Sequence, residues 1–197
     1  MTQELRIVVA DDEADMRDFF EKVLPRYGHQ VVAVAENGAQ LVEHCRQLQP
    51  DLVITDIKMP ELDGIEASRQ ICQERPVPVI LVSAYHDPGL IERAAGDHVL
   101  AYLVKPVGIA DLQPAISIAV RRFEESQSLK RENQDLRQTL ADRKTIEQAK
   151  GLLMKAAGID EKDAFHRLQA LASERNLKLI DAAYSVLAVE KAFAPGK

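Results

Sequence analysis

Four residues of this chain are spaced so that they could accept a phosphoryl group with the help of a metal ion. Asp56 follows the apolar run 52–54, Asp11 and Asp12 follow the first apolar run, and Lys105 follows the last one. Side chains at the carboxyl ends of parallel strands converge on one edge of a sheet, where ligands of open α/β folds bind. The pattern therefore predicts a carboxylate acceptor beside a cation site and a fixed positive charge.

The residue types also indicate which metal ion would serve. A carboxylate reacts poorly with a phosphoryl donor because both are negatively charged. Mg²⁺ removes this repulsion while it binds one or two carboxylates, water and phosphate. Asp12 and Asp56 would supply such a partial shell, with Asp11 acting directly or through water. Lys105 and the hydroxyl of Ser83, at the end of the fourth apolar run, would contact the phosphoryl oxygens.

Short apolar runs that alternate with helical patterns must position these residues. Nearly continuous apolar strands, each followed by a helix, are typical of a parallel sheet covered on both faces. We therefore predict an α/β fold with a flavodoxin-like, doubly wound, five-stranded parallel sheet. Its strands are expected at residues 7–10, 31–35, 52–54, 79–82 and 100–104.

The fifth helical pattern continues beyond the end of this sheet domain. We expect a long helix with Asp111 as its N-cap and Pro114 in its first turn. An apolar seam with one Asn at an a position follows, which favours a short parallel two-stranded coiled coil and hence a homodimer. The alternative is a helical spacer whose apolar edge packs on its own domain. The seam consists of Leu129, Asn133, Leu136 and Leu140.

Three compact helical patterns after residue 143 predict a small all-α domain. Gly158 and Asn176 stand at its two turns, and Asp160 is placed to cap the middle helix. The expected organisation is a first domain over residues 1–122, a helical coiled-coil linker over 123–142 and a three-helix domain over 143–197.

The net charge of -6 is unevenly distributed. Residues 1–142 hold 15 Lys and Arg against 24 Asp and Glu, whereas residues 143–197 hold 10 against 7. The basic part can approach nucleic acid more easily than the acidic part, although so small an excess is also ordinary surface variation. Cys45 and Cys72 lack metal-ligand spacing, which predicts reduced thiols. No apolar run approaches the ~20 residues of a membrane span, and no signal core begins the chain, so we expect no membrane association and a cytoplasmic protein.

Residues 1 to about 120 resemble a response-regulator receiver domain. The resemblance is carried by Asp11 and Asp12 in VVADDE, Asp56 in TDIKMPELDG, Ser83 in ILVSAY and Lys105 in YLVKP. It implies that a sensor histidine kinase phosphorylates Asp56, and that the domain assists only its own phosphorylation and dephosphorylation and is otherwise no enzyme.

The receiver resemblance also assigns roles to further residues. Asp12, Asp56 and the backbone carbonyl of Lys58 would bind Mg²⁺, with Asp11 assisting. Ser83 and Tyr102 would move together as a switch. Their movement would reshape the surface formed by the fourth helix, fifth strand and fifth helix.

Residues from about 124 to 192 resemble an ANTAR domain, the RNA-binding output module of AmiR/NasR-type transcription antiterminators. The segment IEQAKGLLM at residues 146–154 carries the resemblance, together with Arg143-Lys144 before it and Ala164-Phe165 after it. The resemblance implies recognition of RNA hairpin loops, usually by a dimer that engages two hairpins and so prevents a terminator from forming.

Basic residues on these helices are candidates for phosphate contacts. The alternative for any single lysine is a solvated charged face, and Phe165 is expected in the core. The candidates are Arg143, Lys144, Lys150, Lys155, Arg167, Arg175 and Lys178.

Together these features predict a phosphorylation-controlled, RNA-binding antiterminator. One alternative is a receiver with a DNA-binding or protein-binding helical output. The last helix, from Leu179, is mostly apolar, which argues against a basic recognition helix for DNA. A second alternative, a hydrolase that uses Asp56 covalently, lacks a substrate-pocket signal.

Overall fold

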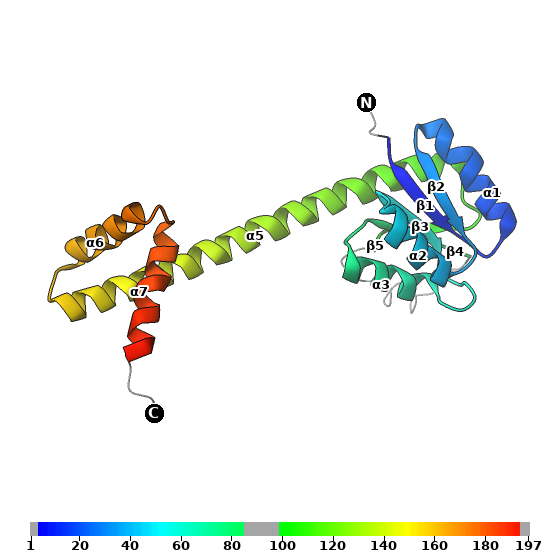
Figure 1. Cartoon of the computed structure of the whole chain (residues 1–197). Coiled ribbons are helices and arrows are strands. Elements are labelled where there is room, and N and C mark those ends of the chain that lie inside the picture. Colours follow the sequence, from blue (N-terminus) through cyan, green and yellow to red (C-terminus); the bar gives the residue numbers. More distant parts are fainter. Residues whose placement is uncertain (1–3, 85–98, 194–197) are drawn as a thin grey trace. The chain divides into compact units, whose positions relative to one another are not determined.

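The computed structural model describes residues 4–84 and 99–193, with side chains up to residue 188 (Figure 1). Two compact units divide the chain, Met1–Gln127 and Ser128–Lys197, and each is described by itself. The fourth helix of the predicted switch surface would fall within residues 85–98, outside the described residues. Among the described helices, none combines the length and the apolar character needed to span a bilayer.

The first unit is built on a five-stranded, fully parallel sheet with the strand order β2-β1-β3-β4-β5. The order turns back between β1 and β3, which is the switch point where doubly wound sheets bind ligands. The predicted flavodoxin-like sheet is thus confirmed. Its strands are β1 (Arg6–Ala10), β2 (Gln30–Ala35), β3 (Leu52–Asp56), β4 (Val79–Ser83) and β5 (Val99–Val104).

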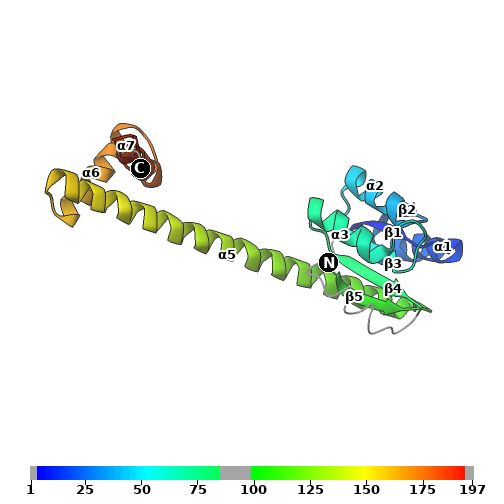
Figure 2. The same ribbon diagram turned by 90° about the horizontal axis from the view of Figure 1, so that it is seen from below.

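The strands are apolar throughout because both faces of the sheet are covered. Along β1, Val8 and Ala10 join one core cluster and Ile7 and Val9 join the other. The helices α2 (Gly38–Leu48) and α3 (Gly64–Glu74) pack on the first side, as Figure 2 shows. On the second side lie α1 (Ala14–Val23), the 3₁₀ turn η1 (Leu24–Tyr27) and the start of α5 (Ile109–Ala157).

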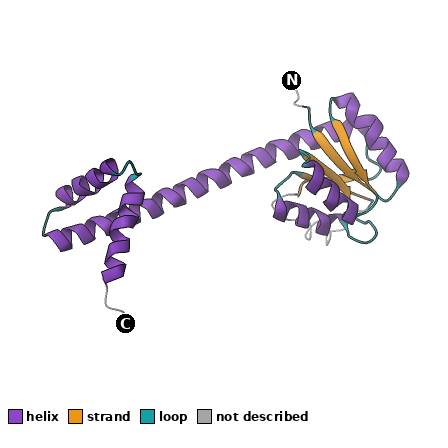
Figure 3. Ribbon diagram, in the orientation of Figure 1, coloured by secondary structure: helices purple, strands orange, loops and turns teal. Residues whose placement is uncertain are grey.

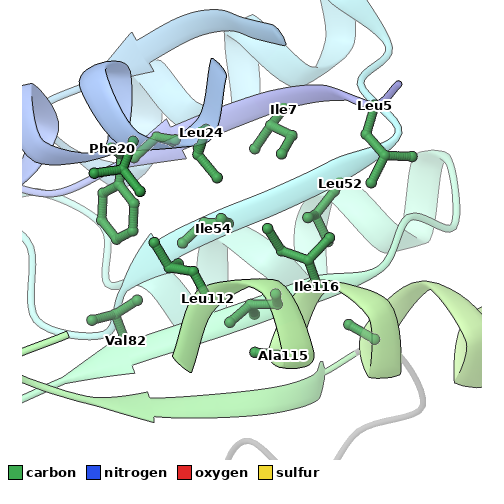
Figure 4. Packing of buried hydrophobic residues seen from close by; sticks show 14 residues of the cluster. Leu5, Ile7, Phe20, Leu24, Leu52, Ile54, Val82, Leu112, Ala115 and Ile116 are labelled. Atoms are coloured by element: carbon green, nitrogen blue, oxygen red, sulfur yellow. The ribbon is translucent and has the colours of Figure 1, made fainter. Parts of the chain in front are cut away.

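The second core cluster anchors α5 to the sheet. Leu112 and Ile116 of α5 are fully or almost fully buried beside Ile54 and Leu52 of β3 (Figure 4). Phe20 is 1% exposed and closes the same cluster from α1. Fully burying one such side chain contributes about 1.5–3 kcal/mol, so the first turns of α5 belong to the sheet domain.

Helix α5 differs from the prediction at its start. It begins at Ile109, so Asp111 lies in the first turn and is not the N-cap, and Pro114 is an interior residue. Proline removes the hydrogen bond that its N–H would give to the carbonyl four residues earlier. The whole helix is 49 residues long and ends at Ala157. The expected boundaries at residues 122 and 142 therefore fall inside one helix, with no break in the backbone.

In the second unit, α6 (Glu161–Glu174) and α7 (Leu179–Phe193) pack against the last turns of α5. Strands occur only in the first unit, as Figure 3 shows for the described residues. Gly158 and Asn176 have φ of 65° and 51°, the left-handed conformation expected at helix ends. Asp160 caps α6, accepting a 2.8 Å hydrogen bond from the Asp163 N–H. The core consists of Ala149, Leu168, Ala172, Ala182 and Ala183.

Candidate functional site

Three carboxylates meet at the carboxyl ends of two neighbouring strands. Asp11 and Asp12 follow β1, and Asp56 ends β3. The register pairs Ala10 with Thr55, so the residues that follow these two come side by side. One oxygen from each carboxylate lies within 4.8 Å of the others. Asp11 is fully buried and Asp56 is 6% exposed, whereas Asp12 faces solvent.

Lys105 brings a positive charge from the end of β5. Its Nζ lies 3.0 Å from Asp11 Oδ2, 2.8 Å from Glu13 Oε1 and 3.7 Å from Asp56 Oδ1. The backbone N–H of Lys105 donates a 2.8 Å hydrogen bond to the carbonyl of Ser83, which ties the end of β5 to the end of β4. The fold thus brings Lys105 together with Asp11, Asp12 and Asp56.

This cluster holds three carboxylates and the ammonium group of Lys105, so negative charge is in excess. Burial raises the pKa of Asp56 to about 6, and the Asp11 carboxylate acts in the same direction, while the Lys105 ammonium opposes them. Burial also raises the pKa of Asp11, against the hydrogen bond from Lys105. Both shifts mean that the charged carboxylates are less stable here than in water. A bound cation would remove part of this cost.

The oxygens of the cluster fit a magnesium ion. Asp11 Oδ2 is buried and accepts no hydrogen bond within the described chain, although Lys105 Nζ is 3.0 Å away. Carboxylate oxygens are the ligands that Mg²⁺ prefers, and it binds through one or two of them while keeping several waters. The exposed position of Asp12 leaves room for those waters. Lys58, whose carbonyl is the expected fourth ligand, lies in the exposed loop after β3.

Arg17 supports the acidic loop and was missed by the sequence reasoning. Its Nη1 donates hydrogen bonds to the carbonyls of Asp11 (2.8 Å) and Asp12 (3.0 Å), and its Nη2 pairs with Glu36 at 2.9 Å. The guanidinium therefore joins the loops that follow β1 and β2. Nothing in the sequence indicates this role, because an arginine in the first turns of a helix is ordinarily a surface residue.

Gly64 is a second support that the sequence did not reveal. It opens α3, and a Cβ added there would collide with the carbonyl oxygen of Asp56. The Gly64 N–H also donates a 2.9 Å hydrogen bond to the Ile57 carbonyl. Any larger residue would push the loop away from Asp56. The contact joins residues brought together by the fold, so the spacing alone does not predict it.

The two residues of the expected switch lie on neighbouring strands. Ser83 ends β4 and is 3% exposed. Tyr102 is half-buried on β5, where it pairs in register with Leu81 and packs against the core cluster beneath α2 and α3.

The candidate RNA-contacting residues fall into two groups. Six are exposed, and none of the six forms an ion pair with another described residue; they are Arg143, Lys144, Lys155, Arg167, Arg175 and Lys178. Lys150 is different, because it is 7% exposed. Its Nζ lies 2.7 Å from Glu161 and 3.0 Å from Glu147, and 5.9 Å above the half-buried ring of Phe165.

This environment corrects the expectation for Lys150. Its ammonium is already paired with two carboxylates, so it does not offer a free charge to a phosphate group. The pKa of Lys150 is raised by the hydrogen bonds with Glu161 and Glu147. Lys150 instead links α5 to α6.

Comparison with known proteins decides the family. Residues 7–117 match the response regulator receiver domain, and residues 134–187 match the ANTAR domain. The chain belongs to the response regulators. A similar protein is the transcriptional regulatory protein PdtaR of Mycobacterium tuberculosis, 41% identical over 182 residues that cover 92% of this chain and 89% of that protein.

Other relatives of this response regulator match its receiver domain alone. The chemotaxis protein CheY of Bacillus subtilis is 41% identical over 102 residues, covering 51% of this chain and 85% of that protein. A receiver domain structure from Clostridium thermocellum has a TM-score of 0.56 and 30% identity, over 60% of this chain and 96% of the other.

Enzymes also occur among the receiver relatives. A protein-glutamate methylesterase of Carboxydothermus hydrogenoformans is 35% identical over 112 residues, which are only 32% of its length. The similarity lies in the receiver domain alone. The combination of a receiver domain with an ANTAR domain fits a regulator. This chain is a two-component response regulator with an RNA-binding output domain.

Proposed function

We propose that Asp56 is the phosphorylation site of this response regulator and that a sensor histidine kinase is its phosphoryl donor. One observation carries the proposal: Asp56 is 6% exposed at a strand end, within reach of two other carboxylates and of Lys105. Phosphorylation controls how the ANTAR domain binds RNA hairpins and thereby controls transcription antitermination, in the cytoplasm.

The chain's own residues perform the transfer. An Asp56 carboxylate oxygen attacks phosphorus, the bond between phosphorus and the kinase imidazole breaks, and the imidazole leaves. Asp11, Asp12, Asp56 and the Lys58 carbonyl would hold Mg²⁺, which would supply positive charge against the repulsion between carboxylate and phosphoryl oxygens. Lys105 and Ser83 then bind the new phosphoryl oxygens.

The added phosphoryl group carries about -1.5 to -2 charge. Ser83 moves toward it, and Tyr102 turns into the space that Ser83 leaves. The ring of Tyr102 is half-buried on the neighbouring strand β5. The movement changes the surface near the start of α5, the helix that continues into the ANTAR domain.

Six exposed cations of the output domain would hold the phosphates of an RNA loop. The domain bounds remain those expected from the sequence: receiver 1–122, helical linker 123–142 and RNA-binding domain 143–197. The active form is a homodimer. Its two linked RNA-binding domains gain avidity for paired hairpins when the spacing of the domains matches the spacing of the hairpins. RNA stem-loops are therefore expected to compete better than duplex DNA.

Labelling with a small phosphoryl donor tests the acceptor. The protein, incubated with acetyl phosphate and Mg²⁺, should gain one phosphoryl group that hydroxylamine removes, as expected of an acyl phosphate, and Asp56→Asn should gain none. Chelation of Mg²⁺ should also prevent labelling of the wild type. Persistent labelling of Asp56→Asn at another residue would overturn the assignment.

A further inference from the structure

The second unit carries a groove that none of the residues of the phosphorylation site lines. It has a volume of about 760 Å³ and lies between the last part of α5 and the middle of α7. No acidic residue lies among the described residues that line it. Its lining includes Gln148, Gly151, Leu152, Lys155, Tyr184 and Leu187.

Gly151 keeps one wall of this groove open. It lies inside α5, where glycine is less favourable than alanine because it loses more backbone freedom on folding. A Cβ added at Gly151 would meet no atom of the described chain within 4 Å. Packing within the chain therefore does not require this glycine, whereas a molecule that enters the groove would benefit from the missing side chain.

Tyr184 supplies an aromatic ring to the opposite wall. The residue is 54% exposed, while its neighbours Ala182 and Ala183 are fully buried in the core of the domain. Its ring is therefore held by a rigid helix but left open to solvent on one side. Aromatic rings presented in this way stack on unpaired bases.

The polar lining fits the remainder of a nucleotide. Lys155 is exposed and forms no ion pair with another described residue, so its charge is available to a phosphate. Gln148, also exposed, carries an amide that can both donate to and accept from a base edge. Arg143 and Lys144 immediately precede the groove residue Thr145 and add positive charge to the same helix. This positive charge complements the phosphates that flank an unpaired base of RNA.

We propose that this groove binds one unpaired base of an RNA loop. The base stacks on Tyr184 and passes over Gly151, Gln148 contacts its edge, and Lys155 binds the adjacent phosphate. The assignment rests on the proposed RNA-binding function and specifies where the loop is read. It also gives a reason for a glycine at position 151 of the helix, where alanine would be more stable.

Matched variants of the full-length chain test the groove. The probe is a pool of RNA stem-loops with one fixed stem and a randomised loop, enriched on the wild type, and affinity is measured by fluorescence anisotropy. Tyr184→Ala should lose affinity by about tenfold or more, whereas Tyr184→Phe, which keeps the ring, should lose little. Gly151→Leu should lose as much RNA affinity as Tyr184→Ala, because the leucine side chain fills the groove. Gly151→Ala should lose less affinity.

Stability measurements separate a blocked groove from a damaged fold. Gly151→Ala should melt at a higher temperature than the wild type, and Gly151→Leu should keep its helical circular dichroism. A loop that carries 5-iodouridine should crosslink to Tyr184 under ultraviolet light, as mapped by mass spectrometry. Wild-type affinity in both Tyr184→Ala and Gly151→Leu would overturn the base site.

The outcomes also separate this site from the function on which it rests. If Arg143→Gln weakens binding but the groove variants do not, the domain binds RNA elsewhere and only the groove assignment is wrong. If the wild type binds no stem-loop, with or without acetyl phosphate, both proposals fail. If Gly151→Leu changes the sedimentation coefficient and leaves RNA affinity unchanged, the groove holds a second copy of the chain instead.

Discussion

The ammonium of Lys105 lies 2.8 Å from the carboxylate of Glu13, a residue that stands outside the metal-binding cluster. The same ammonium lies farther from Asp56, at 3.7 Å. The hydrogen bond with Lys105 lowers the pKa of Glu13, so this carboxylate is charged throughout the neutral range. Glu13 therefore competes with the phosphoryl oxygens for Lys105.

Removing this competitor should favour phosphorylation. We expect Glu13→Gln to raise the rate of Asp56 labelling by acetyl phosphate about two- to fivefold, a modest effect because exposed ion pairs are weak. Single-turnover labelling at saturating Mg²⁺ measures it. Asp18→Asn, which removes an equally exposed acidic charge paired with Lys22, is the control and should match the wild type. A slower Glu13→Gln protein would show that Glu13 positions Lys105.

The raised pKa of Asp56 links stability to pH. With a pKa of about 6 in the fold against an ordinary 3.8, this carboxyl holds its proton more tightly when folded. Its contribution to stability is therefore present below the ordinary pKa and is lost as the pH rises through about 6. We expect Asp56→Asn to raise the unfolding free energy of the metal-free protein by about 2 kcal/mol at about pH 7.5, and by much less at about pH 4.

Urea unfolding in the presence of a chelator measures this difference. Added Mg²⁺ should then stabilise the wild type and have little effect on Asp56→Asn, because ligand binding stabilises only the state that binds. If Asp56→Asn raised the unfolding free energy equally at both pH values, packing, and not charge, would be responsible.

The sheet and the position of the site could be predicted because both follow from the apolar runs that alternate with helical patterns along the sequence. A strand covered on two faces is apolar at every position, so β1, β3 and β4 stand out as runs. Parallel pairing then brings the residues after these runs to one edge. Asp11, Asp56 and Lys105 lie at that edge for this reason.

Partners of long side chains could not be predicted in the same way. Lys150 occurs in a series of basic residues along one helix, and its pattern resembles that of exposed Lys155. Only the packing of α6 on α5 brings Glu161 within 2.7 Å of it. Arg17 and Glu13 illustrate the same limit, because the groups that they contact come from other loops or strands of the sheet.

The contrast between Lys150 and Arg143 can be tested directly. Lys150→Met should lower the melting temperature, since it leaves Glu147 and Glu161 without their shared cation, and should leave the salt dependence of RNA binding unchanged. Arg143→Gln should keep the melting temperature and reduce the slope of log affinity against log salt by about 1. A reduced slope in Lys150→Met would restore this lysine as a phosphate contact.

Leu129, Leu136 and Leu140 of α5 are 65%, 59% and 66% exposed. Leucines this exposed at heptad spacing are expected to pair with a second helix. We expect Leu136→Lys to weaken self-association by about tenfold or more. We expect Asn133→Leu to convert a defined dimer into a mixture of larger species, because a buried Asn at an a position specifies two strands.

Sedimentation equilibrium of phosphorylated and unphosphorylated protein measures both effects. Gln134→Leu, one residue off the seam, is the control and should sediment as the wild type. If the phosphorylated wild type and every variant are monomeric at micromolar concentration, the seam has another partner and dimerisation is not the output.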